Sequence, residues 1–375
     1  MNILWITWKD MGHPEAGGAE VVCSQLAQRL QRAGHSITLL TTDYPGANPK
    51  QTPEGISVIR VGSNRYTHPL QALIYFVRHL RGTYDVVLEE VQGGAPYFCL
   101  PFERRAKRFA FYHQLARINW LYEVPKPFSY VGYSLLVPAA TRLLALCKLP
   151  VITVSESTKQ ELAKFGMTPE RTHIISEGIS VKPVADLAPL KKYVRPTVLS
   201  HGSMRAMKRT IDQIKAFEIA KKRMPDLQMK ISGSSSGSYG AEVLAYIERS
   251  PCKQDIEYVG RTTDQQKIEL MRRCHAILVT SIEEGWGLIV TEAASQGTPA
   301  VVYDVAGLRD SVRNRETGVI TPQNPTALAD GMVGLLQSGR AEYMRMREAA
   351  WQWSKQITFK QSYTDLMAIL ERNDA

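Results

Sequence analysis

Short apolar runs alternate with amphipathic stretches along the whole chain. Residues 2–8, NILWITW, form a nearly continuous apolar run, which is typical of a strand buried on both faces of a parallel sheet. Residues 21–34, VVCSQLAQRLQRAG, have apolar positions at helical spacing and stop at a glycine. Further strand-like and helix-like stretches follow in turn, with a mixed section, predicted to be mainly helical, that ends near residue 148. The first half is therefore predicted to consist of alternating strands and helices.

The same pattern starts again in the second half of the chain. A strand is predicted at residues 197–203, TVLSHGS, and a helix at residues 209–224, RTIDQIKAFEIAKKRM. Between the halves, residues 181–195 have no clean periodicity and contain two prolines and a basic cluster. We interpret this stretch as the linker between two domains.

Alternating strands and helices predict two doubly wound, Rossmann-like α/β domains, each built on a largely parallel sheet. We expect an N-terminal domain at residues 1–180, the linker at 181–195 and a C-terminal domain at 196–355. The last segment, 356–375, is predicted to be a helix that packs back toward the N-terminal domain. Ligands of such sheets bind at the carboxyl ends of the strands. We therefore expect the two sets of strand ends to face each other across a cleft.

The composition is that of a basic, globular protein. The chain has 46 Lys and Arg against 36 Asp and Glu, a formal net charge of +10, and the densest basic cluster is ERRAKR at residues 103–108. No nucleic-acid-binding motif occurs in a suitable context, so no nucleic-acid partner is predicted. The charge fits simple solubility. It also fits contact of residues 103–108 and of the aromatic and basic section 119–136 with an anionic membrane.

Three further features concern the cellular compartment. The start, MNILWITWKD, lacks the features of a signal peptide, and no apolar run reaches the ~18 residues that a membrane-spanning helix needs. The five cysteines are scattered and form no CxxC pair, which favours a reducing compartment over a disulfide framework or a zinc site. We therefore predict a cytoplasmic protein, with peripheral contact with the inner face of the membrane if its acceptor is lipid-linked.

Two glycine-containing stretches after predicted strands are candidate anion sites. In HPEAGGAE, Gly17 and Gly18 precede a helix, whose free N–H groups attract anions. In HGSMRAMKRT, residues 201–210, the turn brings cations to a helix start, where they are unfavourable unless an anion binds. Neither stretch has the GxGxxG spacing or a Walker loop, which argues against an NAD-dependent oxidoreductase. If no anion binds, HPEAGGAE is simply a tight turn and HGSMRAMKRT simply a basic helix start.

Two other stretches carry titratable side chains. His113 follows the apolar strand RFAF, although a lone histidine is also common as a structural residue. In EEGWGLIVTE, residues 283–292, Glu284 and Glu292 flank a Gly-Trp-Gly turn at the start of an apolar helix. The glycines leave amides free to approach a ligand, and carboxylates are good acceptors for the vicinal hydroxyls of a sugar. Compensation of the helix dipole explains one of the acids but not the whole arrangement.

The stretch from Glu284 to Glu292 resembles the motif of two glutamates, separated by seven residues, of retaining family 4 glycosyltransferases with the GT-B fold. The Gly-Gly-Ala-Glu loop, the His-Gln pair, VSESTKQEL, the loop from Gly202 to Lys208, and GLRDSVRNRETGVI resemble the same family in the same order. The resemblance implies transfer of a hexose from a UDP- or GDP-sugar to a hydroxyl acceptor, a glycan or lipid-linked sugar in cell-surface polysaccharide or glycolipid synthesis.

The resemblance also implies roles for individual residues. The C-terminal domain would bind the nucleotide sugar, and the N-terminal domain would bind the acceptor. Lys208, helped by Arg205, would hold the diphosphate, while Glu284 would contact sugar hydroxyls. Glu292 would hold the ribose, and His113 would line the reaction centre, so the catalytic residues would be His113, Lys208 and Glu284. The remaining donor-binding positions are Gly17, Gly18, Gly202, Ser203, Gly285, Trp286, Gly287 and Leu288.

Two positions depart from the family pattern. Ser203 stands where an arginine is usual, so Arg205 is the candidate replacement. The usual Asn-Gly-Val-Asp is replaced by Glu-Gly-Ile-Ser at residues 177–180. No DxD-type metal motif occurs, and Lys208 with helix ends would supply the positive charge, so we expect neither a metal nor another cofactor. The alternatives are a nucleotide-sugar epimerase of the same architecture and an inactive nucleotide-sugar-binding protein.

Overall fold

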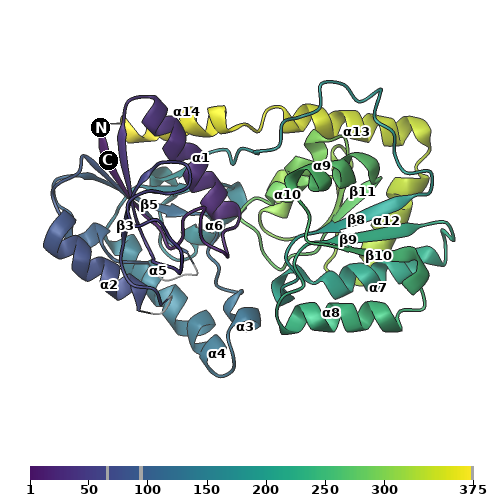
Figure 1. The fold of residues 1–375 in the computed structure, drawn as a ribbon, viewed down its shortest axis with the longest axis horizontal. Helices are drawn as coiled ribbons and strands as arrows, with labels where there is room; N and C mark the ends of the chain where they lie inside the picture. The colour runs from purple at the N-terminus through teal and green to yellow at the C-terminus, as the bar shows by residue number, and fades with distance from the viewer. Residues whose placement is uncertain (65–66, 93–95, 373–375) are drawn as a thin grey trace. The chain divides into compact units, whose positions relative to one another are not determined.

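The computed structural model describes residues 1–64, 67–92 and 96–372. The chain divides into two compact units (Figure 1). Unit 1 contains Met1–Gly178 and Thr358–Ala375, and unit 2 contains Ile179–Ile357. Of the helix predicted at 356–375, residues 359–370 are helical and residues 373–375 lie outside the described part of the chain.

Unit 1 is built on a seven-stranded parallel sheet with the order β3-β2-β1-β4-β5-β6-β7. The inner strands are buried on both faces, which explains the continuous apolar runs of the sequence. The strands are β1 (Asn2–Ile6), β2 (Ser36–Thr41), β3 (Ser57–Arg60), β4 (Val86–Glu90), β5 (Lys107–Tyr112), β6 (Val151–Thr153) and β7 (Thr172–Ile174).

Helices cover both faces of this sheet. Helices α2, α5 and α6 contribute to one apolar core with β1, β4 and β5, and Figure 1 shows α1 and α14 on the opposite side from α2 and α5. The expected long helical section before residue 148 is divided into α3, α4, a π-helical turn and α5. The helices are α1 (Gly18–Arg32), α2 (His68–Tyr75), α3 (Trp120–Glu123), α4 (Phe128–Val131), α5 (Val137–Leu146), α6 (Glu156–Ala163) and α14 (Phe359–Leu370), with π-helical turns at Phe76–Leu80 and Gly132–Leu136.

Unit 2 is built on a six-stranded parallel sheet with the order β10-β9-β8-β11-β12-β13. Its apolar core draws on the sheet and on helices such as α7, α10 and α12. The strands are β8 (Thr197–His201), β9 (Gln228–Ser232), β10 (Ile256–Gly260), β11 (Ala276–Val279), β12 (Ala300–Tyr303) and β13 (Gly318–Thr321). The helices are α7 (Thr210–Lys221), α8 (Ser238–Arg249), α9 (Asp264–Arg273), α10 (Leu288–Ser295), α11 (Leu308–Ser311), α12 (Pro325–Gln337) and α13 (Arg340–Ser354).

Each sheet has a point at which the direction of chain progression reverses. In unit 1 the chain proceeds from β1 to β2 and β3, and then from β4 to β7 on the other side of β1. In unit 2 it proceeds from β8 to β10, and then from β11 to β13 on the other side of β8. Loops diverge at the carboxyl ends of such neighbouring strands and leave room for a ligand. The fold therefore directs attention to the ends of β1 and β4 and to the ends of β8 and β11.

Candidate active site

A pocket in unit 2 lies at the ends of β8 and β11, where the chain direction reverses. It is small and partly open to solvent. Three of the residues predicted to bind the donor phosphates, Gly202, Ser203 and Lys208, contribute to its wall. The residues that line it are Ser200, His201, Gly202, Ser203, Lys208, Thr210, Gln213, Leu278, Val279, Thr280, Ser281 and Ile289. Both the position and the lining fit the strand-end site that the sequence predicts.

Lys208 and Glu284 meet at this pocket although they are far apart in the sequence. Lys208 ends a short 3₁₀ turn after β8, and its ammonium group forms an ion pair with the carboxylate of Glu284. The hydroxyl of Ser281 donates a second hydrogen bond, of 2.6 Å, to Glu284 Oε1. Burial would raise the pKa of Glu284, but Lys208, Ser281 and Arg205 together hold that pKa below its usual value. The site therefore holds a carboxylate beside two cations.

The backbone at Glu284 is fixed by the loop at Ala306 and Gly307, to which the sequence analysis assigned no role in the site. The amide of Glu284 donates a 3.2 Å hydrogen bond to the carbonyl of Ala306. Gly307 has a φ of +77°, and a Cβ there would collide with the carbonyl oxygen of Glu284. Only glycine permits this close approach without strain. In the sequence, the glycine at the start of GLRDS, after β12, could have indicated this close approach.

The glycine turn and the second acid lie at the start of α10. Gly287 precedes the helix with a φ of +92°, and Leu288 is the first helical residue, so amides at this end are not used within the helix. The indole N–H of Trp286 is buried and has no hydrogen-bond partner among the described residues. Gly285 lies in the loop before it. The turn therefore presents N–H donors of both backbone and side chain.

Glu292 does not share the cation of Glu284. Its two carboxylate oxygens lie 3.2 and 3.3 Å from the ammonium group of Lys267 on α9. Burial raises the pKa of Glu292, and Lys267 opposes this only in part. Burial and the charge of Lys267 also lower the pKa of His201, a pocket residue, to about 4. Lys267, which the sequence prediction missed, therefore lies within electrostatic reach of the pocket.

In unit 1, His113 lies between two carboxylates. Its Nδ1 is 3.2 Å from Glu177 Oε1, and its Nε2 is 3.7 Å from Glu90 Oε1. The ring stacks on Phe111 at 4.5 Å between centroids. Burial would lower the pKa of His113, but Glu177 and Glu90 outweigh it and raise the pKa to about 10. His113 is therefore an imidazolium at neutral pH, and Glu177, at a departure from the family pattern, stabilises its charge.

Glu90 connects His113 to the reversal point of the unit 1 sheet. Its carboxylate accepts hydrogen bonds from Trp5 Nε1 at 2.9 Å, from Thr7 Oγ1 at 2.6 Å and from Gln92 Nε2 at 2.6 Å. Trp5 and Thr7 lie on β1 and just after it, while Glu90 ends β4. In the sequence, the two acids that end the apolar run YDVVLEE, residues 84–90, could have indicated that Glu90 belongs to the site.

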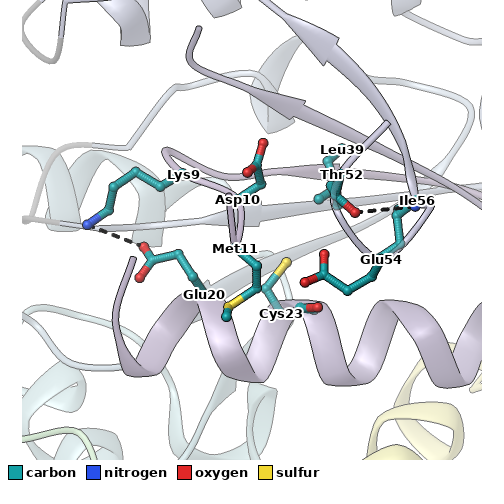
Figure 2. A pocket seen from close by; sticks show the side chains of 10 residues that line it. Lys9, Asp10, Met11, Glu20, Cys23, Leu39, Thr52, Glu54 and Ile56 are labelled. Atoms are coloured by element: carbon teal, nitrogen blue, oxygen red, sulfur yellow. Dashed lines mark hydrogen bonds and ion pairs between the residues drawn. The ribbon is translucent and has the colours of Figure 1, made fainter. Parts of the chain in front are cut away.

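The predicted phosphate loop of unit 1 is folded around Glu20. Gly17, in extended conformation, donates its N–H to Glu20 Oε2 at 2.6 Å, and Gly18 begins α1. Lys9 lies 3.7 Å from the same carboxylate and donates to the carbonyl of Glu15 at 2.7 Å. Figure 2 shows Lys9 and Glu20 at one side of a small pocket. Among the described residues, no hydrogen bond, ion pair or ring contact joins Gly17 or Gly18 to His113.

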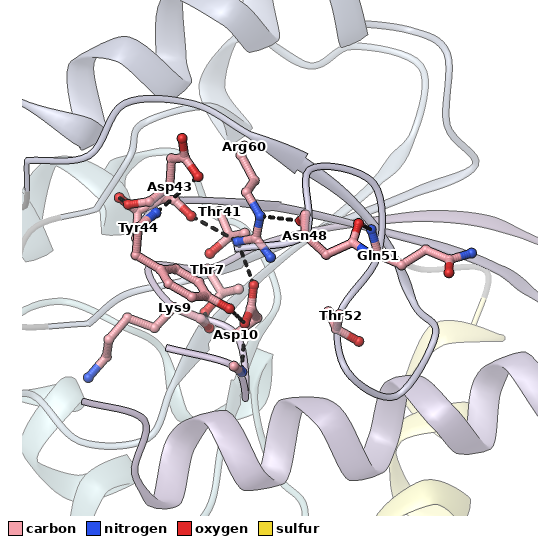
Figure 3. A network of polar contacts seen from close by, with 12 residues as sticks. Thr7, Lys9, Asp10, Thr41, Asp43, Tyr44, Asn48, Gln51, Thr52 and Arg60 are labelled. Carbon is pink, nitrogen blue, oxygen red and sulfur yellow. Dashed lines mark hydrogen bonds and ion pairs between the residues drawn. The ribbon is translucent and has the colours of Figure 1, made fainter. Parts of the chain in front are cut away.

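A second buried ion pair lies beside this pocket, and the sequence prediction did not identify it. Arg60, at the end of β3, is 2.6 Å from Asp10 Oδ2, and both side chains are almost fully buried. Asp10 Oδ1 accepts hydrogen bonds from the hydroxyl of Tyr44 at 3.2 Å and from the amide of Gly12 at 2.8 Å. Figure 3 shows Arg60 and Tyr44 converging on Asp10. This network fixes the loop after β1 against β3.

The described residues contain no group of three or more His, Cys, Asp or Glu side chains placed to hold a metal ion. Among the helices of residues 1–64, 67–92 and 96–372, none has both the length and the apolar character to cross a bilayer.

Family models match nearly the whole chain. Residues 16–182 match the model "Glycosyltransferase Family 4", and residues 188–353 match "Glycosyl transferases group 1". An uncharacterized glycosyltransferase of Methanocaldococcus jannaschii is 23% identical over 92% of this chain and 91% of its own. The D-inositol 3-phosphate glycosyltransferase of Jonesia denitrificans is 21% identical over 96% of this chain and 92% of its own.

Solved structures agree with the fold. Sucrose-phosphate synthase from Thermosynechococcus elongatus superposes with a TM-score of 0.79 at 20% identity, covering 98% of both chains. HepE from Anabaena, solved in complex with UDP-glucose, has a TM-score of 0.74 at 15% identity and covers 99% of both. The lipopolysaccharide outer core galactosyltransferase WaaB has a TM-score of 0.71 at 16% identity, covering 98% of this chain and 100% of its own.

These matches confirm the predicted GT-B fold, with its two parallel α/β sheets. They also confirm the nucleotide-sugar chemistry predicted from the two-glutamate motif. The chain belongs to the family 4 glycosyltransferases, which transfer a sugar from a nucleotide sugar with retention and without a metal ion.

Proposed function

We propose that this glycosyltransferase moves a hexose from a UDP- or GDP-hexose to a hydroxyl group of a glycan or lipid-linked sugar. The observation that carries the donor part is the Lys208–Glu284 pair at the unit 2 pocket. A sugar diphosphate presents an anion and hydroxyls side by side. A cation next to a hydrogen-bond acceptor, beside free amides, matches that pair of groups.

In this proposal each charged group of the candidate donor site has one role. Lys208, with Arg205, neutralises the negative charge that develops on the departing diphosphate. Glu284 accepts hydrogen bonds from sugar hydroxyls, while the amides of residues 285–288 approach the sugar and phosphates. Glu292 accepts hydrogen bonds from the ribose hydroxyls. These hydrogen bonds replace part of its contact with Lys267. The acceptor oxygen bonds to the anomeric carbon on the face that the diphosphate leaves, and its proton passes to the departing phosphate oxygen.

In unit 1, we propose that His113 lines the reaction centre as an imidazolium. Its Nε2–H has no hydrogen-bond partner among the described residues, since Glu90 lies 3.7 Å away. In this proposal the N–H donates a hydrogen bond to an oxygen of the donor sugar. Gly17 and Gly18 keep their proposed role at the donor phosphates.

The relatives support the classes of donor and acceptor. HepE binds UDP-glucose in its solved complex, which favours a UDP-hexose as the donor. WaaB acts on a lipopolysaccharide core, and the Jonesia denitrificans relative acts on an inositol phosphate, so hydroxyl acceptors differ within the group. A lipid-linked glycan would bring this basic protein to an anionic membrane surface. We propose such peripheral contact on the cytoplasmic side.

The test begins with a thermal-shift screen of common UDP- and GDP-sugars. A donor that binds only the native state increases the free energy of unfolding, by ~2.7 kcal/mol at a hundredfold excess over its Kd, and therefore raises the melting temperature. The stabilising donor is then incubated with glycan and lipid-linked acceptors, with and without a chelator. We expect transfer with the anomeric configuration kept, and unchanged turnover in chelator.

Each alternative gives a different result. Conversion of the donor sugar in the absence of any acceptor would indicate an epimerase. Stabilisation by a donor without transfer to any acceptor would indicate an inactive binding protein. Loss of turnover in chelator, restored by Mg²⁺, would contradict the role given to Lys208. No stabilisation by any UDP- or GDP-sugar would overturn the donor assignment.

A further inference from the structure

Exposed apolar side chains concentrate in two neighbouring parts of unit 1. Most of the large apolar side chains that are exposed in the described chain lie in residues 70–77 and 122–146. Phe128 is 68% exposed, Leu135 61% and Leu146 77%. Exposed apolar side chains that gather in one region, rather than being scattered singly, commonly mark an interaction site. We name the exposed side chains of residues 70–77 and 122–148 the apolar–basic surface.

The apolar side chains project from ordered structure. The indole of Trp120, on α3, packs so closely on Gly132 that any side chain at Gly132 would collide with it. Arg117 donates a 2.8 Å hydrogen bond to the carbonyl of Tyr133 and lies 3.9 Å from the centre of its ring. These contacts fix α4 and the following π-helical turn, which carry Phe128 and Leu135. The outward direction of these two side chains is therefore built into the fold.

Both parts cover the same face of the unit 1 sheet. Ala72 and Phe76, in and just after α2, and Val137 and Leu144 of α5 enter one apolar core, which places both segments over that face. Their outer sides are apolar as well. In the first segment the exposed positions follow helical spacing and belong to one stripe; they are Leu70, Ile74 and Val77.

Exposed cations border the apolar side chains. Residues 120–148 contain Lys126, Arg142 and Lys148 but a single acid, Glu123. All three cations are exposed. Exposed Arg78 and Arg81 follow the stripe of the first segment. Apolar groups rimmed by cations, with tyrosines among them, match the boundary between acyl chains and anionic headgroups.

We propose that the apolar–basic surface docks unit 1 on an anionic lipid membrane, with Phe128 and Leu135 entering the headgroup region. No helix in the described part of the chain could span the bilayer, so the protein would lie on it. Each exposed cation near such a surface adds to the attraction. The purpose of this docking is access to a lipid-linked acceptor, and that purpose rests on the proposed function. The docking itself requires neither donor nor acceptor.

The test is co-sedimentation of the full chain with phosphatidylglycerol and with phosphatidylcholine vesicles at low salt, without any substrate. We expect binding to phosphatidylglycerol vesicles only, weakened by salt. The double variant Phe128→Ser, Leu135→Ser should lower the apparent affinity about tenfold or more. The charge variant Arg142→Glu, Lys148→Glu should lower it at least as far.

Matched controls come from unit 2. Val194 is fully exposed and apolar, so Val194→Ser removes an apolar side chain elsewhere and should leave vesicle binding unchanged. The exposed pair Lys222→Glu, Arg340→Glu reverses the same amount of charge as the charge variant and should weaken binding much less. Every variant should keep the melting temperature of the parent and its shift with the stabilising nucleotide sugar. That shift reports on the proposed function separately from docking.

Three outcomes would overturn the proposal. The first is sedimentation of the Phe128 and Leu135 double variant to the same extent as the parent. The second is equal binding of the parent to neutral and anionic vesicles. The third is a dimer, seen by light scattering without lipid, that the double variant abolishes, because the surface would then be an interface between two copies.

Discussion

At the residue scale, the candidate site depends on pairs of opposite charges brought together from distant parts of the chain. Lys208 and Glu284 are 76 residues apart and form an ion pair, and Lys267 and Glu292 form another. Truncating one partner leaves the other charge partly buried and unpaired. Effects on stability and on catalysis must therefore be separated in each variant.

For Lys208→Ala we expect kcat for sugar transfer to fall about a hundredfold, roughly 3 kcal/mol in the barrier. The reason is that the ammonium group would stabilise charge on the leaving diphosphate more in the transition state than in the bound donor. Initial rates at saturating donor test this, with the exposed Lys222→Ala as the control for loss of a lysine. A rate close to that of the parent would remove Lys208 from the mechanism.

The sequence predicted Lys208, Glu284 and Glu292 as site residues, but it did not predict that Lys208 pairs with Glu284 or that Lys267 pairs with Glu292. The motif spacing predicts that Glu284 precedes a helix and that Glu292 lies within it, and α10 begins at Leu288. Lys267 could not be found in this way because its contact with Glu292 depends on how α9 packs beside α10. Side-chain partners between elements follow from tertiary packing, which periodicity along one segment does not describe.

At the element scale, segments with a clear apolar run or a clear periodicity were predictable, and segments without either were not. Helix α7, from Thr210 to Lys221, falls within the stretch predicted for it. Strand β13, Gly318–Thr321, was missed because its sequence, GVIT, has only two adjacent apolar residues and so gives no clear strand pattern. The π-helical turn at Gly132–Leu136 is another example, since it departs from the 3.6-residue repeat on which the prediction relies.

The turn before α11 determines where Glu284 lies, so a single methyl group there should disturb the site. We expect Gly307→Ala to destabilise the protein by about 1–2 kcal/mol, because of its positive φ, and to weaken donor binding at least about tenfold. The added Cβ would push the carbonyl of Glu284 away. Calorimetry of donor binding and the melting temperature test both effects.

The matched control is Gly334→Ala in α12. A Cβ at Gly334 meets no atom within 4 Å, and its backbone is helical, so alanine should be neutral or stabilising by up to about 1 kcal/mol. Donor binding should not change in this control. Equal donor affinity in Gly307→Ala and the parent would show that the Ala306–Gly307 loop does not position Glu284.

At the scale of the whole molecule, two sheets of similar topology each carry a polar cluster beyond the carboxyl ends of their strands. In unit 1 the cluster is His113 with Glu90 and Glu177, and in unit 2 it is Lys208 with Glu284. The sequence predicted the two α/β folds because strand and helix alternate throughout. It could not predict that Glu177 would stabilise the charge on His113, since those residues are 64 positions apart.

The charge of His113 should make the stability of the whole chain depend on pH. Its pKa is raised from 6.5 to about 10 in the folded state. The proton therefore stabilises the fold fully below pH ~6.5, and this contribution is lost as the pH rises toward 10. In Glu177→Gln the pKa of His113 should fall, so the variant should be less stable than the parent at pH 6, with the difference vanishing near pH 10.

The measurement is the melting temperature of the parent and of Glu177→Gln between pH 6 and pH 10. A deficit of a few kcal/mol at pH 6 corresponds to at least about 4 °C for a unit of this size. The exposed Glu170→Gln removes a similar charge from the same unit and should give a small difference that does not vary over this range. Using the difference between variant and parent cancels all other titrating groups. A deficit that stays constant from pH 6 to pH 10 would mean that Glu177 supports the fold without holding a proton on His113, and the imidazolium role at the reaction centre would then be lost as well.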